Sequence, residues 1–185
     1  MISYKSQDEL VPAAFDDSTS SYIWIFFLYA CSRYILHIHI TCVRPHLEYA
    51  CQLWDPYTNK DAQLLEDVQK FACKVCLKKW NLDYHSMLCL LGLPPLTIRH
   101  KYLKLVTMYN IISGNMYFPS GHFVYYTSPY STRNCNFIRP FSRLNYMYHS
   151  FVPSVISLWN NLPQSIKLSS SVYCFKELLQ NHLFT

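Results

Sequence analysis

The chain has 185 residues, of which 51% are hydrophobic and only 15% are charged, and this balance excludes a chain that is disordered throughout. Glycine occurs only three times, which excludes collagen-like designs and glycine-rich phosphate-binding loops. The net charge of +5 is compatible with a nucleic-acid partner without requiring one.

The first 42 residues form a segment that is polar and then apolar. Residues 1–17 are polar and acidic and lack a basic stretch, so we expect no signal peptide and an intracellular location. The eight cysteines are then expected to be thiols rather than disulfides. Residues 22–31 are apolar without interruption, but this is about half of the ~20 residues that cross a bilayer, and Arg33 follows. A membrane span over residues 22–42 is therefore disfavoured.

Residues 43–114 are predicted to form several helices. Pro45 suits the first turn of a helix, and a long helix over 61–80 and an apolar run over 84–91 follow it. The helix over 61–80 is expected to turn one apolar stripe inward, made of Leu64, Leu65, Val68, Phe71, Ala72, Val75 and Cys76. The most regular helical spacing is that of Ile98, Tyr102, Leu105, Tyr109 and Ile112.

Residues 115–185 change in character. Residues 115–152 are rich in Tyr, Phe, Ser and Asn and alternate only in part, so irregular strand or loop structure is expected. A short helix is predicted over 155–161. A final helix after Ser170 or Ser171 is expected to turn four residues inward, namely Phe175, Leu178, Leu179 and Leu183.

Two patterns with possible chemistry do not lead to a site. Cys73 and Cys76 have redox spacing, but they lie in the middle of a predicted helix rather than at its N-terminus. A zinc site needs about four ligands, and no second short-spaced pair follows, although Cys89 and His100 could be recruited. Asp16 and Asp17 have no partner strand that could hold a second metal ligand, so an exposed acidic turn is expected. No catalytic residue, metal site or cofactor is predicted.

Two groups of basic residues could contact nucleic acid. Lys70, Lys74 and Lys78 recur every four residues, which predicts a ridge that phosphates could occupy. The alternative is a solvated helix face with Glu66 paired to Lys70. The second group stands among Tyr and Phe, a composition typical of single-strand binding, although aromatic residues more often form core; it comprises Arg133, Arg139 and Arg143.

The stretch over residues 43–57 reads VRPHLEYACQLWDPY. It closely resembles the segment that follows the polymerase core in LINE-type (non-LTR) retrotransposon reverse transcriptases, whose pattern is approximately VRP-LEYA--VWDPY. LPPL over 93–96 with Arg99 resembles the family's L-PL--RR, with His100 in place of the second Arg, and WNNLP over 159–163 resembles its closing WN-LP. The resemblance covers about residues 41–184. The residues that carry it most clearly are Arg44, Pro45, Leu47, Glu48, Tyr49, Trp54, Asp55, Pro56, Trp159, Asn160, Leu162 and Pro163.

The resemblance implies a fold and limits the function. It implies a mainly α chain, with a divergent segment over 1–42, a helical thumb-like region over 43–114, and an irregular aromatic-rich segment with C-terminal helices over 115–185. In that family, RNA-directed DNA synthesis uses palm aspartates upstream of the matched region, so no catalytic residue carries over. We expect a truncated remnant that is not an enzyme and that binds RNA or RNA–DNA duplex weakly at most. The alternatives are a small protein-interaction module or a membrane-tethered protein.

Two expectations concern packing. Trp159 should be a buried anchor facing Phe175 and Leu179 rather than a binding residue. The helix over 98–112 needs a partner surface, and the resemblance implies that much of the parent protein that could supply one is missing. Residues 43–114 are therefore expected to fold only with help.

Overall fold

A computed structural model describes residues 32–119, 123–124 and 136–184. This part of the chain is mainly helical and contains no strand, which confirms the predicted fold class. Residues 32–38 are helical and continue into a π-helix, η1 (His39–Val43). The helices that follow are α2 (Arg44–Glu48), α3 (Cys51–Trp54), α4 (Asn59–Leu77), α5 (Tyr84–Leu91), α6 (Leu96–Ile112), α7 (Asn145–Tyr148), α8 (Phe151–Asn160), α9 (Gln164–Lys167) and α10 (Val172–Phe184).

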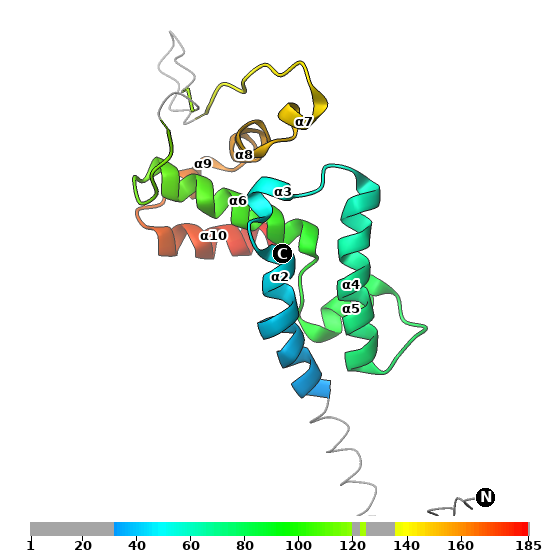
Figure 1. Cartoon of the computed structure of the whole chain (residues 1–185). Helices are drawn as coiled ribbons and strands as arrows, with labels where there is room; N and C mark the ends of the chain where they lie inside the picture. The colour runs from blue at the N-terminus through cyan, green and yellow to red at the C-terminus, as the bar shows by residue number, and fades with distance from the viewer. Residues whose placement is uncertain (1–31, 120–122, 125–135, 185) are drawn as a thin grey trace, which may run out of the picture.

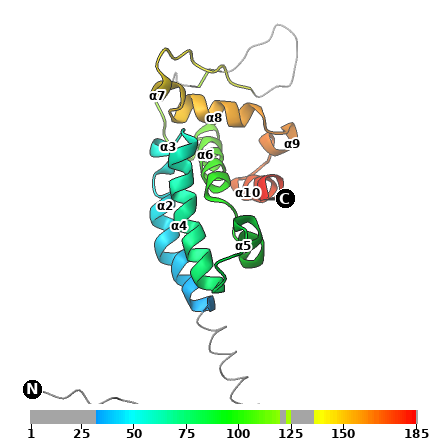
Figure 2. The ribbon, with the colours of Figure 1, turned by 90° about the vertical axis from the view of Figure 1, so that its right-hand side faces the viewer.

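Helix α6 lies at the centre of the arrangement. Helices α8 and α10 pack against it, and α2, α3 and α4 also contact it. Figure 1 shows α8 and α10 on opposite sides of α6, while the η1–α2 column and α4 run across them. In Figure 2 the η1–α2 column and α4 stand side by side, with α5 next to α4. The chain thus forms a group of helices around α6, α8 and α10 and a second group around α4 and α5.

Local sequence signals set several helix ends. The side chain of Thr58 accepts a hydrogen bond from the backbone N–H of Asp61 and begins α4, and Asp83 does the same for α5 through the N–H of His85. Gly92 ends α5 in the left-handed conformation (φ 63°) that favours glycine. The helix predicted after Pro45 is interrupted at Ala50, which also has a left-handed backbone (φ 50°). Two short helices, α2 and α3, therefore replace one longer one.

The larger hydrophobic core joins the middle of the chain to its C-terminal helices. It contains Tyr102, Leu105, Met108 and Tyr109 of α6, and from the C-terminal part Val155, Ile156, Trp159, Leu162, Ile166, Phe175 and Leu179. Trp159 is only 2% exposed, and its ring lies 5.9 Å from that of Phe175, so the expectation of a buried anchor is confirmed. The apolar stripe of α6 is buried as predicted, and its partner surface comes from this same chain.

The aromatic-rich segment contributes to this core at two described positions. The rings of Phe123 and Phe137 are 5.8 Å apart, and Phe137 also contacts Trp159. Phe141 and Tyr146 lie exposed. The segment is therefore irregular in backbone, as expected, and only part of its aromatic content is core.

Helix α4 buries only part of the predicted face. Of the seven residues of the expected inward stripe, Leu64, Val68 and Phe71 are exposed and only Cys76 is fully buried. The other buried residues of α4 are Glu66, Gln69 and Cys73. The prediction was wrong for the three exposed residues because polar partners on neighbouring segments fix the orientation of the helix, as described below. A smaller difference is Leu178, which was expected to face inward and is exposed.

The structure describes only part of residues 22–42, over which a membrane span was disfavoured. No helix among the described residues is long and apolar enough to cross a bilayer. Residues 22–31, like Asp16, Asp17 and Arg133, lie outside the described part of the chain.

Candidate functional site

Part of the motif over 43–57 is bonded to α6. The carboxylate of Asp55 accepts a hydrogen bond from Nδ1 of His100 at 2.7 Å and another from Nζ of Lys104 at 2.6 Å. His100 is only 2% exposed and Lys104 is also buried. One carboxylate from the turn after α3 thus bonds an imidazole and an ammonium group that stand one helical turn apart on α6.

The pKa of Asp55 reflects these contacts. Burial alone would raise the pKa, but the hydrogen bonds from His100 and Lys104 and their positive charge outweigh it and hold the pKa below its usual value. Asp55 is therefore ionised at neutral pH.

The second imidazole nitrogen of His100 is also occupied. Nε2 lies 3.0 Å from the backbone carbonyl oxygen of Leu47, which can only accept. Both ring nitrogens therefore lie within hydrogen-bond distance of an acceptor oxygen in the protein, and the Asp55–His100 pair joins two segments of the chain.

A second ion-pair group lies one residue earlier on α6. The guanidinium of Arg99 makes two hydrogen bonds to the carboxylate of Glu48, one of them 2.9 Å long. Arg44 also faces this carboxylate, at 3.3 Å. Burial and the nearby charge of Arg99 lower the pKa of Arg44. Gln52 adds a hydrogen bond to Thr107, and the ring of Trp54 meets that of His100 edge-on. The motif over 43–57 is thus tied to α6 by polar bonds.

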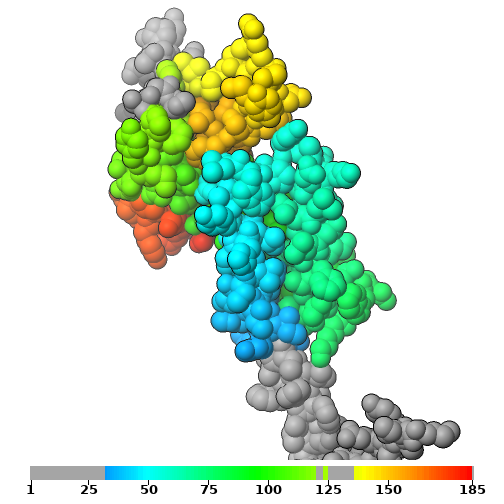
Figure 3. Space-filling model, viewed as in Figure 1, coloured from blue at the N-terminus to red at the C-terminus, as the bar shows by residue number. Residues whose placement is uncertain are grey.

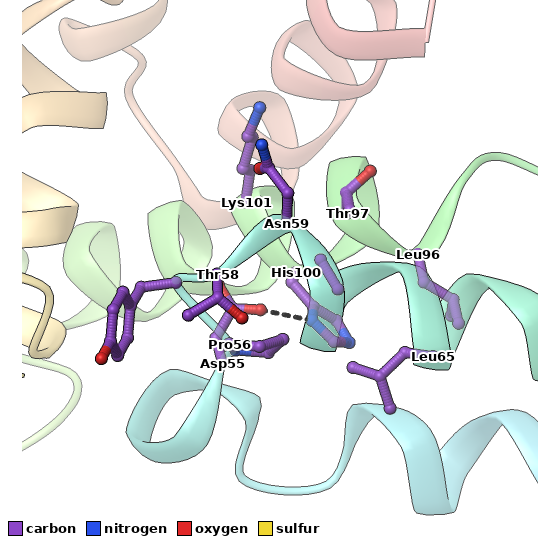
Figure 4. Close-up of a pocket in the computed structure, with 11 residues that line it drawn as sticks. Asp55, Pro56, Thr58, Asn59, Leu65, Leu96, Thr97, His100 and Lys101 are labelled. Carbon is purple, nitrogen blue, oxygen red and sulfur yellow. Dashed lines mark hydrogen bonds and ion pairs between the residues drawn. The ribbon is translucent and has the colours of Figure 1, made fainter.

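A cavity of about 190 Å³ opens beside this network. Figure 4 shows Asp55 and His100 at its wall, with Pro56, Thr58, Leu65 and Lys101 around them. The Asp55 carboxylate at its wall already accepts hydrogen bonds from His100 and Lys104. The charged side chain of Lys101 also lines the cavity.

A buried polar group explains the orientation of α4. The Glu66 carboxylate accepts hydrogen bonds from the hydroxyl of Tyr84 and from the backbone N–H of Thr97 in the first turn of α6. Gln69 donates to the carbonyl of Pro94 at 3.0 Å and to the Tyr84 hydroxyl at 3.1 Å. Burial and the Glu66 carboxylate raise the pKa of Tyr84. Glu66 therefore points inward and is not paired with Lys70.

The closing motif over 159–163 is also structural. The side-chain amide of Asn160 bonds the backbone of Phe137 twice, accepting from its N–H at 3.1 Å and donating to its carbonyl at 2.9 Å. Leu162 is buried, and Pro163 stands just before α9. The ammonium of Lys167 reaches the carbonyl of Asn160. This motif fastens the aromatic-rich segment to α8.

The cysteines of α4 do not form a reactive site. Burial raises the pKa of Cys73 to about 11 and also raises that of Cys76. Within the ranges that the structure describes, no three His, Cys, Asp or Glu side chains converge as metal ligands.

The predicted basic residues fall into two separate places. Lys78 is exposed, Lys70 and Lys74 are half-buried, and the ammonium of Lys74 lies 5.9 Å from the ring centre of Trp80. No carboxylate of the described residues forms an ion pair with any of these three lysines. Arg139 lies flat over the ring of Tyr148, at 3.7 Å, and bonds its hydroxyl, whereas Arg143 is exposed. Figure 1 places the C-terminal end of α4 and the segment before α7 at opposite ends of the molecule.

Sequence reasoning missed the polar contacts of these residues. Gln69 and Lys104 were not singled out, Glu66 was assigned to an exposed face, and Arg99 and His100 were noted only for a family pattern or a possible zinc site. The available signal was the i, i+4 spacing of His100 and Lys104, which places two polar side chains on one face of the helix.

Searches with protein-family models, curated proteins and solved structures find no match to this chain.

Proposed function

We propose that residues 43–184 derive from the region after the palm of a non-LTR retrotransposon reverse transcriptase, and that the chain binds RNA or RNA–DNA duplex weakly and without sequence preference. Contacts between the matched residues support the family part of the proposal. Glu48 and Asp55 meet Arg99 and His100, so positions that are distant in the pattern lie in contact. Such pairs give a physical reason for these residue types to occur together.

The binding part of the proposal rests on one observation. Lys70, Lys74 and Lys78 stand along α4 with no carboxylate of the described residues paired to them, because Glu66 bonds Tyr84 and Thr97 instead. Lysines without protein counter-ions are free to neutralise phosphates and to release the counter-ions of a nucleic acid.

The salt dependence of binding tests this proposal. Affinity for a fluorescein-labelled 20-base-pair RNA–DNA hybrid is measured by anisotropy at several salt concentrations. Changing Lys70, Lys74 and Lys78 together to Gln should weaken binding and lower the log–log salt slope by roughly 0.7–0.9 for each lysine that contacts a phosphate. The matched control changes three other exposed lysines to Gln, Lys60, Lys101 and Lys176, and has the same net charge. Equal losses in the two variants would show a general charge effect and would contradict a site on α4.

A protein-interaction module is the second candidate, and the exposed side chains of Leu64 and Val68 on α4 favour it. If this candidate is correct, size-exclusion chromatography with light scattering should show a mass above 21.9 kDa for the wild type. A variant with both residues changed to Gln should then run as a monomer.

A further inference from the structure

Two large aromatic side chains lie exposed where α4 ends. Phe71 is 61% exposed and Trp80 is 59% exposed, and their ring centres are 6.3 Å apart with the planes inclined at 63°. Lys78 has a left-handed backbone (φ 51°), which ends α4 and turns the chain so that Trp80 comes back beside Phe71. Figure 1 shows the connection between α4 and α5 projecting from the body of the molecule, and Figure 3 shows α4 along its edge.

The surroundings of these rings are strongly basic. Residues 70–83 contain four lysines, Lys70, Lys74, Lys78 and Lys79, and a single acidic residue, Asp83. The Asp83 carboxylate is already used, because it accepts the N–H of His85 at the start of α5. Lys74 holds its ammonium 5.9 Å from the ring centre of Trp80, within the range of a cation–π contact. An exposed aromatic surface with lysines nearby that are not paired to carboxylates complements an anionic partner that also carries flat apolar groups.

We propose that Trp80, supported by Phe71, is a base-stacking platform, and that this end of α4 takes single-stranded RNA or DNA in preference to duplex. The inference rests on the proposed nucleic-acid binding and names the form of nucleic acid that the site recognises. An unpaired base offers a free face to the indole ring, while the lysines contact the phosphates on either side of it. A duplex offers the same phosphates, but its bases are stacked on one another, so only the electrostatic part of the binding is available to it.

A protein partner fits this end of α4 less well. An apolar partner that covered Phe71 and Trp80 would take Lys74 and Lys78 out of water without supplying a counter-charge, which is costly. A nucleic acid supplies that charge with its phosphates. Self-association through this surface is therefore an outcome that the experiment must be able to detect.

The experiment compares single strands with a duplex. Anisotropy is measured at low salt with labelled 15-nucleotide oligouridylate, 15-nucleotide oligothymidylate and a 15-base-pair RNA–DNA hybrid. Trp80→Leu should weaken binding of both single strands about tenfold and change binding of the hybrid less than twofold. The matched control is Tyr173→Leu, which removes an exposed ring from α10 and should change none of the three. Far-ultraviolet circular dichroism checks that each variant keeps its helices.

A second measurement locates the stacked base directly. Oligouridylate carrying 5-bromouridine is cross-linked by near-ultraviolet light, and the adduct should map to the peptide that contains Phe71 or Trp80. Adducts only on other peptides, or equal effects of Trp80→Leu on single strands and hybrid, would overturn the stacking platform while leaving duplex binding intact. Loss of self-association, instead of loss of single-strand affinity, in Trp80→Leu would assign the surface to a second copy of the chain. A wild-type chain that binds none of the three probes would overturn both this inference and the proposed function.

Discussion

Asp55 accounts for much of the polar bonding between the turn after α3 and the helix α6. Its carboxylate accepts a hydrogen bond from His100 and neutralises the ammonium of Lys104, and both partners are buried. Removing one member of such a group leaves an uncompensated buried charge, and this costs roughly 3–5 kcal/mol, more than the net gain from forming the pair. Losing Asp55 is therefore expected to cost more free energy than forming its bonds contributes.

Asp55→Asn is expected to lower the free energy of unfolding by about 3–5 kcal/mol at pH 7, measured by urea denaturation. The matched control is Asp67→Asn, at an exposed carboxylate that bonds only Gln63 and should change stability by less than about 0.5 kcal/mol.

The effect of Asp55→Asn should depend on pH. Because the folded-state pKa of Asp55 lies below its unfolded value of about 3.9, its contribution is complete above that pH and is lost as the pH falls through the folded-state pKa. The difference between wild type and variant should therefore narrow below about pH 4. A difference that stays constant from pH 7 to pH 2.5 would contradict the role of the charge.

Sequence reasoning reached some of these residues for a different reason. Glu48, Asp55 and Asn160 were selected by a family pattern, which gives no information about what they contact. Their partners lie 23–51 residues away in the chain, at Arg99, His100 and Phe137. Pairings at such separations depend on the tertiary fold, so local spacing could not predict them.

At the level of helices, α4 and α6 show when an apolar pattern is sufficient. Helix α6 is surrounded by α3, α4, α8 and α10, so nearly any apolar residue on it finds a partner, and its stripe was predicted correctly. Helix α4 has its main helix contacts with α5 and α6. Glu66 and Gln69 bond Tyr84, Thr97 and Pro94 there, and these bonds turn Leu64 and Phe71 outward.

The orientation of α4 can be tested by exchanging side chains on its two faces. Leu64→Gln and Val68→Gln should each change the free energy of unfolding by less than about 0.5 kcal/mol, because both side chains already face solvent. Glu66→Leu should destabilise by about 1–3 kcal/mol, because the hydroxyl of Tyr84 and the N–H of Thr97 lose their acceptor in a part-buried site. The opposite order, with costly changes at Leu64 and Val68, would show that the apolar stripe faces the core.

At the scale of the molecule, residues 43–114 were expected to need a partner surface, and helices from the C-terminal part of the same chain provide one. The stripe of α6 packs against α8 and α10, which lie beyond residue 150. The larger core therefore crosses the boundary that composition suggested at residue 114. Composition changes there because the backbone becomes irregular, whereas the packing continues through Phe137 and Trp159 to the C-terminal helices.

Two separate fragments of the chain test whether the folding of α6 depends on α8 and α10. A fragment over residues 32–118 retains α4, α5 and α6 but lacks every residue that covers Tyr102, Leu105 and Tyr109 from α8 and α10. Single helices with an uncovered apolar stripe are marginal in water, so this fragment should unfold without a cooperative transition by circular dichroism at 222 nm. Adding a second fragment over residues 145–184 should restore the transition, because association buries the same surface.

The matched control is the second fragment with Trp159→Ala. This change removes a buried ring and costs roughly 3–5 kcal/mol, so the variant fragment should fail to restore the transition at equal concentration. If residues 32–118 alone unfold cooperatively, with the same midpoint as the whole chain, then the α4–α5 core is sufficient for folding and the contacts of α6 with α8 and α10 are dispensable.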